Sequence, residues 1–386
     1  MKLNYISFIQ GQFLILLFFL LNFERWDPLN LGIDYLIFKI PFVLLLLSFS
    51  FSFSKLFKLN LRNPVIKYIL IYFIILTFIS FINSDKVNNN YFDSLFCINL
   101  ILFLLTFNYL CLNRSVIYKC FIFYSFGAFI LSILYLFNIG TESDPTGRVS
   151  IFGENQNSIG VNMCFASLMI ISIVFENKLK LNKLRYLLLF QLPTIIIFLA
   201  ATGSRLATIS LLISIAAYFL LWNAKNVSKK IILLFTTFSL FFILFTLFGN
   251  NSIISERISD TVKSGEIGNR DLLLIMIIPI VLNNLFFGVG LTGYNKLMID
   301  NYTSPHNGIV EVLCYTGIFG LIFFLTFFIK SLIRGINKKK IENEILPLVF
   351  YFPIIGILIS AQIFQSKIVW ILLAYVIAHN KKIEMK

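Results

Sequence analysis

Long apolar runs recur along almost the whole chain, and short polar segments separate each run from the next. A transmembrane helix needs about 20 predominantly apolar residues, and many of these runs reach that length. A soluble domain carries about 25% charged residues, whereas 13% of this chain is charged and 58% is hydrophobic. We therefore expect an all-α, polytopic membrane protein, and the composition excludes a disordered, collagen-like or disulfide-rich chain.

The apolar runs predict about 12 transmembrane helices in a single integral membrane domain that covers residues 1–386. The expected spans are 6–23, 33–54, 65–83, 93–112, 116–138, 157–175, 183–201, 204–222, 230–249, 308–333, 345–363 and 366–379. No small-residue cleavage site follows the first run, so we expect a retained span and not a signal peptide. An even number of spans puts both termini on one side of the membrane.

The distribution of basic residues among the loops indicates which side that is. The chain holds 32 Lys and Arg against 18 Asp and Glu, a net charge of +14. Alternate loops and the two termini carry 22 of the basic residues and 4 of the acids, so the two sides carry +18 and −4. Cytoplasmic loops are enriched in Lys and Arg, so both termini are expected in the cytoplasm. The net positive charge is thus explained by basic cytoplasmic loops, and we expect no nucleic acid as a partner.

Residues 249–307 are expected to form a large exoplasmic loop between the ninth and tenth spans. Inside this loop an apolar run at about 272–287 is broken by Pro279. A full span here would move the basic segment 338–340 to the outside, against the charge rule. We therefore interpret the run as an interfacial helix, in a loop whose length is itself typical of a functional segment.

Four basic residues are predicted to lie where a helix end meets the exoplasmic boundary: Arg148, Arg205, Arg270 and His306. A cation at a helix N-terminus opposes the helix dipole by roughly 0.3–1 kcal/mol, so stability alone does not favour such positions. Together with backbone N–H groups and the hydroxyl of Ser204 they suit an anion, since phosphate binds at helix N-termini and Arg grips it bidentately. Each residue also has an alternative role that involves no ligand. Arg148 and Arg205 could extend to the lipid headgroups, Arg270 could form a surface ion pair, and His306 could cap a helix or form a hydrogen bond.

The histidines, Glu311 and the cysteines were considered for proton transfer and metal binding. A histidine has a near-neutral pKa and suits general-base work, and His306 is the one expected on the outer side. Glu311, five residues later, is a weaker candidate for a pocket-facing polar residue. Five cysteines without CxxC spacing are interpreted as small hydrophobes, and two histidines do not make a zinc or iron site. We expect no metal and no cofactor.

Several segments also carry a family resemblance. In chain order they are Gly147–Asn157, Thr202–Arg205, Asn269–Asp271, and Pro305–Asn307 followed by Gly317–Gly320. Their order and outward placement resemble the O-antigen polymerase and O-antigen ligase superfamily, membrane glycosyltransferases that act on undecaprenyl-diphosphate-linked glycans. The resemblance covers residues 147–330, and the first five spans match only in hydropathy.

The resemblance implies roles for the candidate residues. Arg205 and Arg270 would neutralise charge on the departing diphosphate, and His306 would take the proton from the acceptor hydroxyl. Because diphosphate is a good leaving group, an inverting single displacement needs no nucleotide, metal or covalent enzyme intermediate. The substrate-binding residues are expected to be Arg148, Ser204, Asn307 and Glu311.

Within this superfamily the choice of acceptor stays open. The bias toward Phe, Ile, Leu, Asn and Lys resembles AT-rich surface-polysaccharide gene clusters, where polymerases are commoner, so we favour a polymerase acting on a lipid-linked repeat unit. The spacing from His306 and Asn307 to Gly317 and Gly320 instead favours a ligase acting on lipid A-core. A transporter or lipid-glycan flippase is the alternative from another class, although such proteins place ionisable groups near the bilayer midplane.

The resemblance also implies a setting. It places the protein in the bacterial inner (plasma) membrane, with the active site facing the periplasm or exoplasm. The expected partners are the lipid bilayer, the undecaprenyl-diphosphate-linked oligosaccharide, and a chain-length regulator and flippase of the same pathway.

Overall fold

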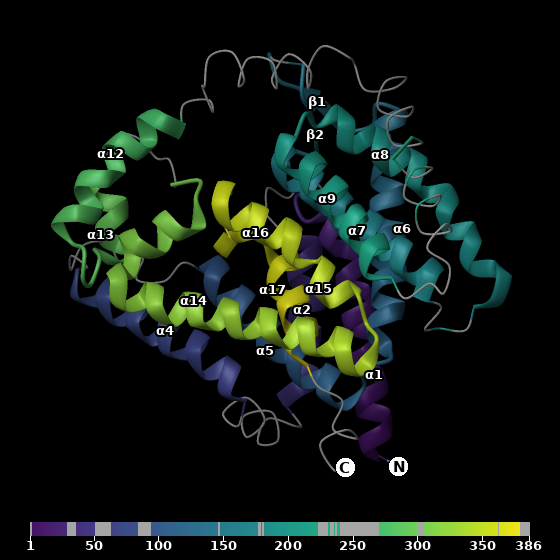
Figure 1. Cartoon of the computed structure of the whole chain (residues 1–386), viewed down its shortest axis with the longest axis horizontal. Helices are drawn as coiled ribbons and strands as arrows, with labels where there is room; N and C mark the ends of the chain where they lie inside the picture. The colour runs from purple at the N-terminus through teal and green to yellow at the C-terminus, as the bar shows by residue number, and fades with distance from the viewer. Residues whose placement is uncertain are drawn as a thin grey trace.

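The computed structural model consists almost entirely of helices, as Figure 1 shows, which confirms the expected helical class. The residues that it describes are 2–28, 36–50, 63–83, 94–145, 147–176, 179, 181–222, 231, 235, 238–239, 270–298, 305–361 and 363–378.

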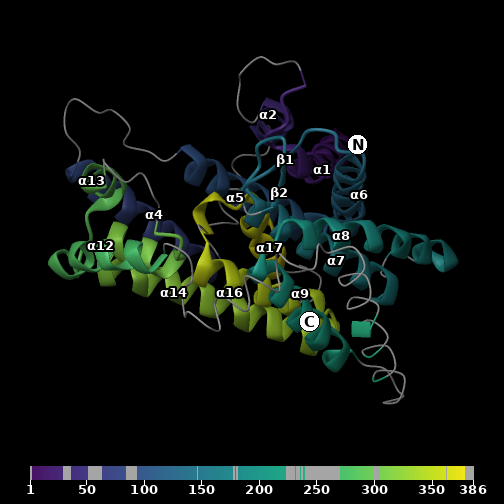
Figure 2. The same cartoon turned by 90° about the horizontal axis from the view of Figure 1, so that it is seen from above.

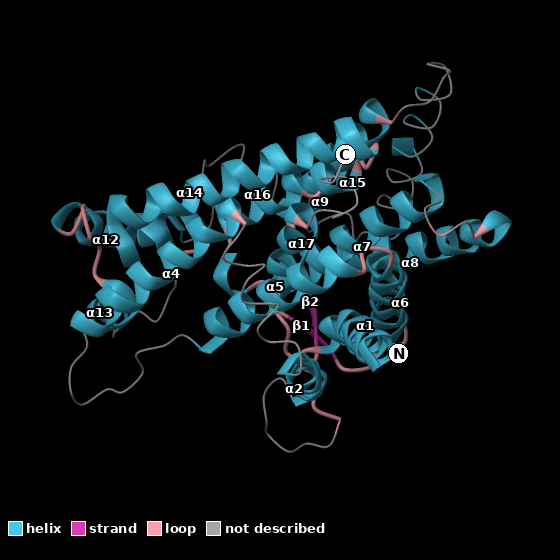
Figure 3. Ribbon diagram, turned by 90° about the horizontal axis from the view of Figure 1, so that it is seen from below, coloured by secondary structure: helices cyan, strands magenta, loops and turns pink. Residues whose placement is uncertain are grey.

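The first half of the chain combines long helices with one short hairpin. Its elements are α1 (Lys2–Leu20), η1 (Leu21–Phe23), α2 (Leu36–Ser50), α4 (Pro64–Ile82), α5 (Ser94–Leu112), α6 (Val116–Leu136), β1 (Thr141–Ser143) and β2 (Val149–Ile151). The two strands pair antiparallel with Glu142 opposite Ser150. Figure 3 shows this small sheet among the helices, and β2 contacts the helix α7 that follows it.

The second half is helical throughout its described part. Its elements are α7 (Gln156–Glu176), η2 (Asn182–Gln191), α8 (Leu192–Ala201), α9 (Arg205–Leu221), α12 (Arg270–Asn283), α13 (Gly290–Leu297), α14 (Gly308–Glu342), α15 (Leu346–Val349), α16 (Tyr351–Ser360), η3 (Ile363–Gln365) and α17 (Lys367–Ile377).

Among the described residues, six helices are long and apolar enough to cross a membrane. They are Ile6–Phe23, Pro64–Ile82, Val116–Leu136, Gln156–Glu176, Lys183–Ala201 and Gly308–Glu342. Shorter apolar helices lie in five further expected spans, at Ile37–Ser50, Phe96–Leu112, Arg205–Leu221, Leu346–Ser360 and Lys367–Ile377. The expected span 230–249 lies almost wholly outside the described residues. The helices support a membrane protein, while the twelve-span topology and its sidedness stay predictions.

Helix α17 occupies the centre of the molecule. Every residue from Lys367 to Ile377 is buried, and a helix that is apolar all round belongs either in a core or in a membrane. Its Trp370 joins an aromatic cluster in which the rings of Phe96 and Phe364 lie 4.7 Å apart, edge to face. In Figure 2, α1 and α2 lie on one side of this centre and α14 lies on the other.

Helices α4 and α14 run side by side along one edge, with α12 and α13 at their end (Figure 1). Helix α12 coincides with the expected interfacial helix but ends at Asn283, so the expected boundary at 287 is four residues too late. The chain then turns through residues 284–289 and packs into a break in α14. Whether residues 249–307 form one exoplasmic loop, with α12 at the membrane interface, stays a prediction.

Gly317 forms that break. It takes φ 60° and ψ −162°, a conformation open essentially to glycine alone. The backbone groups that the break releases are satisfied by the turn, since Ile318 N–H donates to Leu285 O at 2.9 Å and Val289 N–H donates to Cys314 O at 2.8 Å. This geometry explains why a glycine stands at this position of the Gly-x-x-Gly segment.

Candidate functional site

A cavity of about 590 Å³ lies where several segments of the chain meet. Its ionisable lining residues come from distant parts of the sequence: Glu24, Arg25, Glu154, Arg205, His306 and Lys367. The sequence prediction of a site at Arg205 and His306 stays untested by any bound ligand, but the structure does place both residues on one cavity.

Four helices begin at this cavity. Helices α7, α9, α14 and α17 start at Gln156, Arg205, Gly308 and Lys367, and residues in or next to each first turn line the cavity. The N-terminus of a helix carries about half a positive charge and presents unbonded N–H groups. Several N-termini around one cavity therefore create a favourable environment for an anion.

Arg205 is presented by the turn Thr202-Gly203-Ser204. Gly203 takes φ 60°, and Ser204 caps α9 by accepting a hydrogen bond from Ala207 N–H. Ser204 is buried, and the described lining of the cavity does not include it. The structure therefore shows Ser204 holding the turn that carries Arg205, while substrate binding by its hydroxyl stays a prediction.

Arg148 lies behind the cavity wall and joins three segments. Its Nε donates to Thr202 O at 2.9 Å, and its Nη2 donates to Asn157 Oδ1 at 2.9 Å. Asn157 lines the cavity, and Thr202 belongs to the turn before Arg205. Arg148 thus ties β2 to the starts of α7 and α9 as a positioning contact, while substrate binding by Arg148 stays a prediction.

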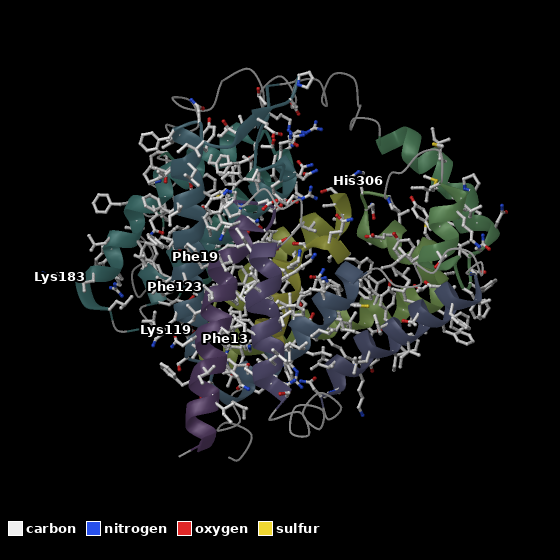
Figure 4. All side chains as sticks on the ribbon, turned by 180° about the vertical axis from the view of Figure 1, so that it is seen from behind. Phe13, Phe19, Lys119, Phe123, Lys183 and His306 are labelled. Atoms are coloured by element: carbon white, nitrogen blue, oxygen red, sulfur yellow. The ribbon has the colours of Figure 1, made fainter. Side chains whose placement is uncertain are left out.

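His306 lines the cavity at the start of α14, whereas Asn307 caps that helix. His306 takes φ 47°, an uncommon conformation for a residue with a side chain, and it lines the cavity. Figure 4 labels it beside the yellow ribbon of α16 and α17. Asn307 caps α14, since its Oδ1 accepts hydrogen bonds from Ile309 N–H at 3.0 Å and Val310 N–H at 3.2 Å.

The remaining two candidates are Glu311 and Arg270. Glu311 is buried, accepts a hydrogen bond from the Tyr315 hydroxyl at 3.4 Å and is not among the described lining residues. Arg270 is the first residue of α12, and its side chain lies outside what the structure describes. Within the described part of the chain, no group of three or more His, Cys, Asp or Glu is placed to hold a metal ion.

Comparison with known families adds an independent observation. The family described as O-antigen ligase matches residues 190–325. This match confirms the resemblance to the O-antigen polymerase and ligase superfamily. The matched range contains Arg205 and His306, so the two sequence candidates on the cavity both lie in the family segment. A search of curated proteins finds no match.

Four ionisable lining residues outside the O-antigen ligase segment were not among the predicted site residues: Glu24, Arg25, Glu154 and Lys367. Lys367 Nζ lies 2.6 Å from Glu24 Oε2, and Arg25 Nε lies 3.5 Å from Glu154 Oε2. Burial raises the pKa of Glu24, with Lys367 acting in the opposite direction, and burial likewise raises the pKa of Glu154, with Arg25 opposing. Glu154 lies in the segment Gly147–Asn157, which carries the family resemblance, whereas Glu24, Arg25 and Lys367 are single charges at the ends of apolar runs, which are ordinary in sequence.

The turn after β2, which carries Glu154, is held by residues that follow η1. Arg25 Nη1 donates to Gly153 O at 3.3 Å, and Trp26 stacks on Phe152 with ring centroids 5.3 Å apart. Phe152 and Gly153 both take positive φ, which turns the chain from β2 toward α7. The N-terminal segment, which resembles the superfamily only in hydropathy, therefore completes the cavity.

Proposed function

We propose that this protein is a membrane glycosyltransferase of the O-antigen polymerase type, which transfers an undecaprenyl-diphosphate-linked glycan onto another lipid-linked repeat unit. The observation that carries the proposal is the cavity at which four helix N-termini converge with Arg205 and His306. The match of residues 190–325 to the O-antigen ligase family supports an activity of the ligase and polymerase type.

The cavity is suited to a leaving diphosphate. As the bond between the anomeric carbon and the diphosphate oxygen breaks, the electron pair and its negative charge move onto the diphosphate. Arg205 and the dipoles of the helix starts would stabilise that charge, and one preorganised donor such as Arg205 is worth roughly 10²–10³ in rate. Arg270, at the start of α12, is proposed as a second cation for the same group.

The acceptor hydroxyl must lose a proton as it attacks the anomeric carbon from the opposite face. His306 is proposed to take this proton, because a neutral imidazole is a good general base near pH 7. Asn307 caps α14 and fixes the backbone next to His306. The result is an inverting single displacement, in which the glycan is transferred without a covalent enzyme intermediate.

A ligase that transfers the glycan to lipid A-core is the second candidate. The spacing from His306 and Asn307 to Gly317 and Gly320 favours it, and the family match is compatible with both activities. The two activities share the donor and differ in the acceptor.

The glycan profile of a deletion strain tests the proposal. Loss of a polymerase leaves a single repeat unit attached to the lipid core, whereas loss of a ligase leaves none attached and lipid-linked polymer accumulates. In a Gram-positive source the corresponding readout is the length of the glycan chains. Repeat units trapped on the cytoplasmic leaflet would contradict a transferase and support a flippase.

A further inference from the structure

One wall of the cavity carries amide and hydroxyl side chains. Asn162 projects from α7, Gln365 belongs to η3 and Ser366 precedes α17, and all three line the cavity. Within the described part of the chain these three side chains, called the amide wall below, make no hydrogen bond to the protein. Each amide offers two N–H donors and an acceptor oxygen, and the hydroxyl both donates and accepts.

Two ion pairs line the same cavity. Lys367 pairs with Glu24 at 2.6 Å, and Arg25 pairs with Glu154 at 3.5 Å, so these four side chains together carry no net charge. The Lys367 side chain is only 3% exposed. A buried ion pair is weak evidence for stability, because desolvation can exceed the Coulombic gain. A role in holding a ligand therefore explains the buried Lys367–Glu24 pair better than stability alone does. The Arg25–Glu154 pair is more exposed, with side chains 45% and 22% exposed, and such a pair adds little to stability.

This combination is not suited to a second anion. A phosphate group offers acceptor oxygens only, so it is best bound by donors and cations, and the carboxylates of Glu24 and Glu154 would repel it. A sugar ring instead presents hydroxyl groups that both donate and accept. Carboxylates, amides and a hydroxyl side by side satisfy that pattern, and a carboxylate that accepts from a sugar hydroxyl forms a charge-assisted bond.

We propose that the amide wall and the two ion pairs form a subsite for an uncharged sugar ring, within the same cavity as the diphosphate subsite at Arg205. The inference rests on the proposed function, and it deepens that function by assigning the glycan to residues outside the O-antigen ligase segment. A cavity of about 590 Å³ falls within the roughly 300–1,000 Å³ range of ligand pockets, so a diphosphate and a sugar ring can share it.

The test uses the purified full-length protein in lipid nanodiscs, with two small probes. N-acetylglucosamine probes the sugar subsite and inorganic pyrophosphate probes the diphosphate subsite, and binding is followed by ligand-observed NMR. Asn162→Ala and Gln365→Ala should each weaken sugar binding by roughly fivefold, the effect of losing one hydrogen bond, and leave pyrophosphate binding unchanged. Ser360→Ala is the matched control, because its hydroxyl lines the cavity but already donates to Gly356 O at 2.9 Å.

The outcomes separate this inference from the proposed function. Absence of sugar binding to the wild type, or equal sugar binding to the wild type and the two amide variants, would overturn the sugar subsite. Pyrophosphate binding that Arg205→Ala leaves intact would instead count against the diphosphate site. Transfer assays with the lipid-linked substrate then show which sugar the subsite binds. If the two amide variants have a higher KM than the wild type for the acceptor alone, the subsite binds the acceptor sugar. If they have a higher KM for the donor, it binds the donor sugar.

Discussion

Replacing Gly317 with alanine should destabilise the protein strongly. The residue takes φ 60° and ψ −162°, and such a conformation costs a residue with a side chain about 1–3 kcal/mol. An added Cβ would lie 2.4 Å from the carbonyl carbon and oxygen of Phe286, which are backbone atoms held by the hydrogen bonds of the turn. Overpacking of this kind costs about 1–3 kcal/mol more. We expect a total loss of about 2–6 kcal/mol.

Gly335→Ala is the matched control in the same helix. Its added Cβ would meet Pro347 O at 3.5 Å, an ordinary contact, and alanine favours a helix interior over glycine by about 0.5–1 kcal/mol. Thermal unfolding of both variants in detergent should give a clearly lower midpoint for Gly317→Ala and an unchanged or higher midpoint for Gly335→Ala. Equal midpoints for the two variants would refute the assignment of the α14 break to Gly317.

Three further predictions concern the cavity. Arg148→Ala removes two charge-assisted hydrogen bonds worth about 1.5–3 kcal/mol each, so both the thermal midpoint and glycan transfer should fall, and full transfer activity would contradict its positioning role. Gly160→Ala places a Cβ 2.7 Å from the Cβ of Ser204, so transfer per folded molecule should fall severalfold as the turn before Arg205 is displaced. Because burial raises the pKa of Glu24 and Glu154, both carboxyls gain protons at a higher pH than exposed carboxyls do. Protonation removes negative charge from the cavity, so in a His306→Gln background the affinity for inorganic sulfate should rise as the pH is lowered from 7. This rise should be smaller when both acids are replaced by Gln.

The positions of the helices were largely predictable, because a run of apolar residues leaves the chain few alternatives. The expected spans 116–138 and 157–175 correspond to α6 and α7 within a few residues. The expected span 308–333 corresponds to α14, which continues to Glu342 because its polar end packs against the protein and buries Lys338. Hydropathy did not predict the break at Gly317, because the turn that packs into it lies about 30 residues earlier in the sequence.

The candidate site was predictable only where a local pattern existed. Arg205 follows a Thr-Gly-Ser turn and His306 precedes a helix, so residue type and position in the sequence indicate both residues, and both line the cavity. The pairing of Lys367 with Glu24 joins the two ends of the chain, and no periodicity or spacing encodes such a contact. Glu311 was predicted either to orient His306 loosely or to face a pocket. It is buried beside Tyr315 and is not among the described lining residues, so its role stays a prediction.

The central claim is that Arg205 stabilises the charge of a departing diphosphate. The direct measurement is glycan transfer by purified wild type, Arg205→Ala and Arg185→Ala in nanodiscs, with an undecaprenyl-diphosphate-linked repeat unit as both donor and acceptor. Arg185 contacts Tyr186 and is not among the described lining residues of the cavity, so its variant controls for loss of a positive charge. The account predicts wild-type transfer by Arg185→Ala and at least a roughly hundredfold loss in Arg205→Ala. A well-inserted Arg205→Ala protein that transfers glycan at the wild-type rate would contradict the account.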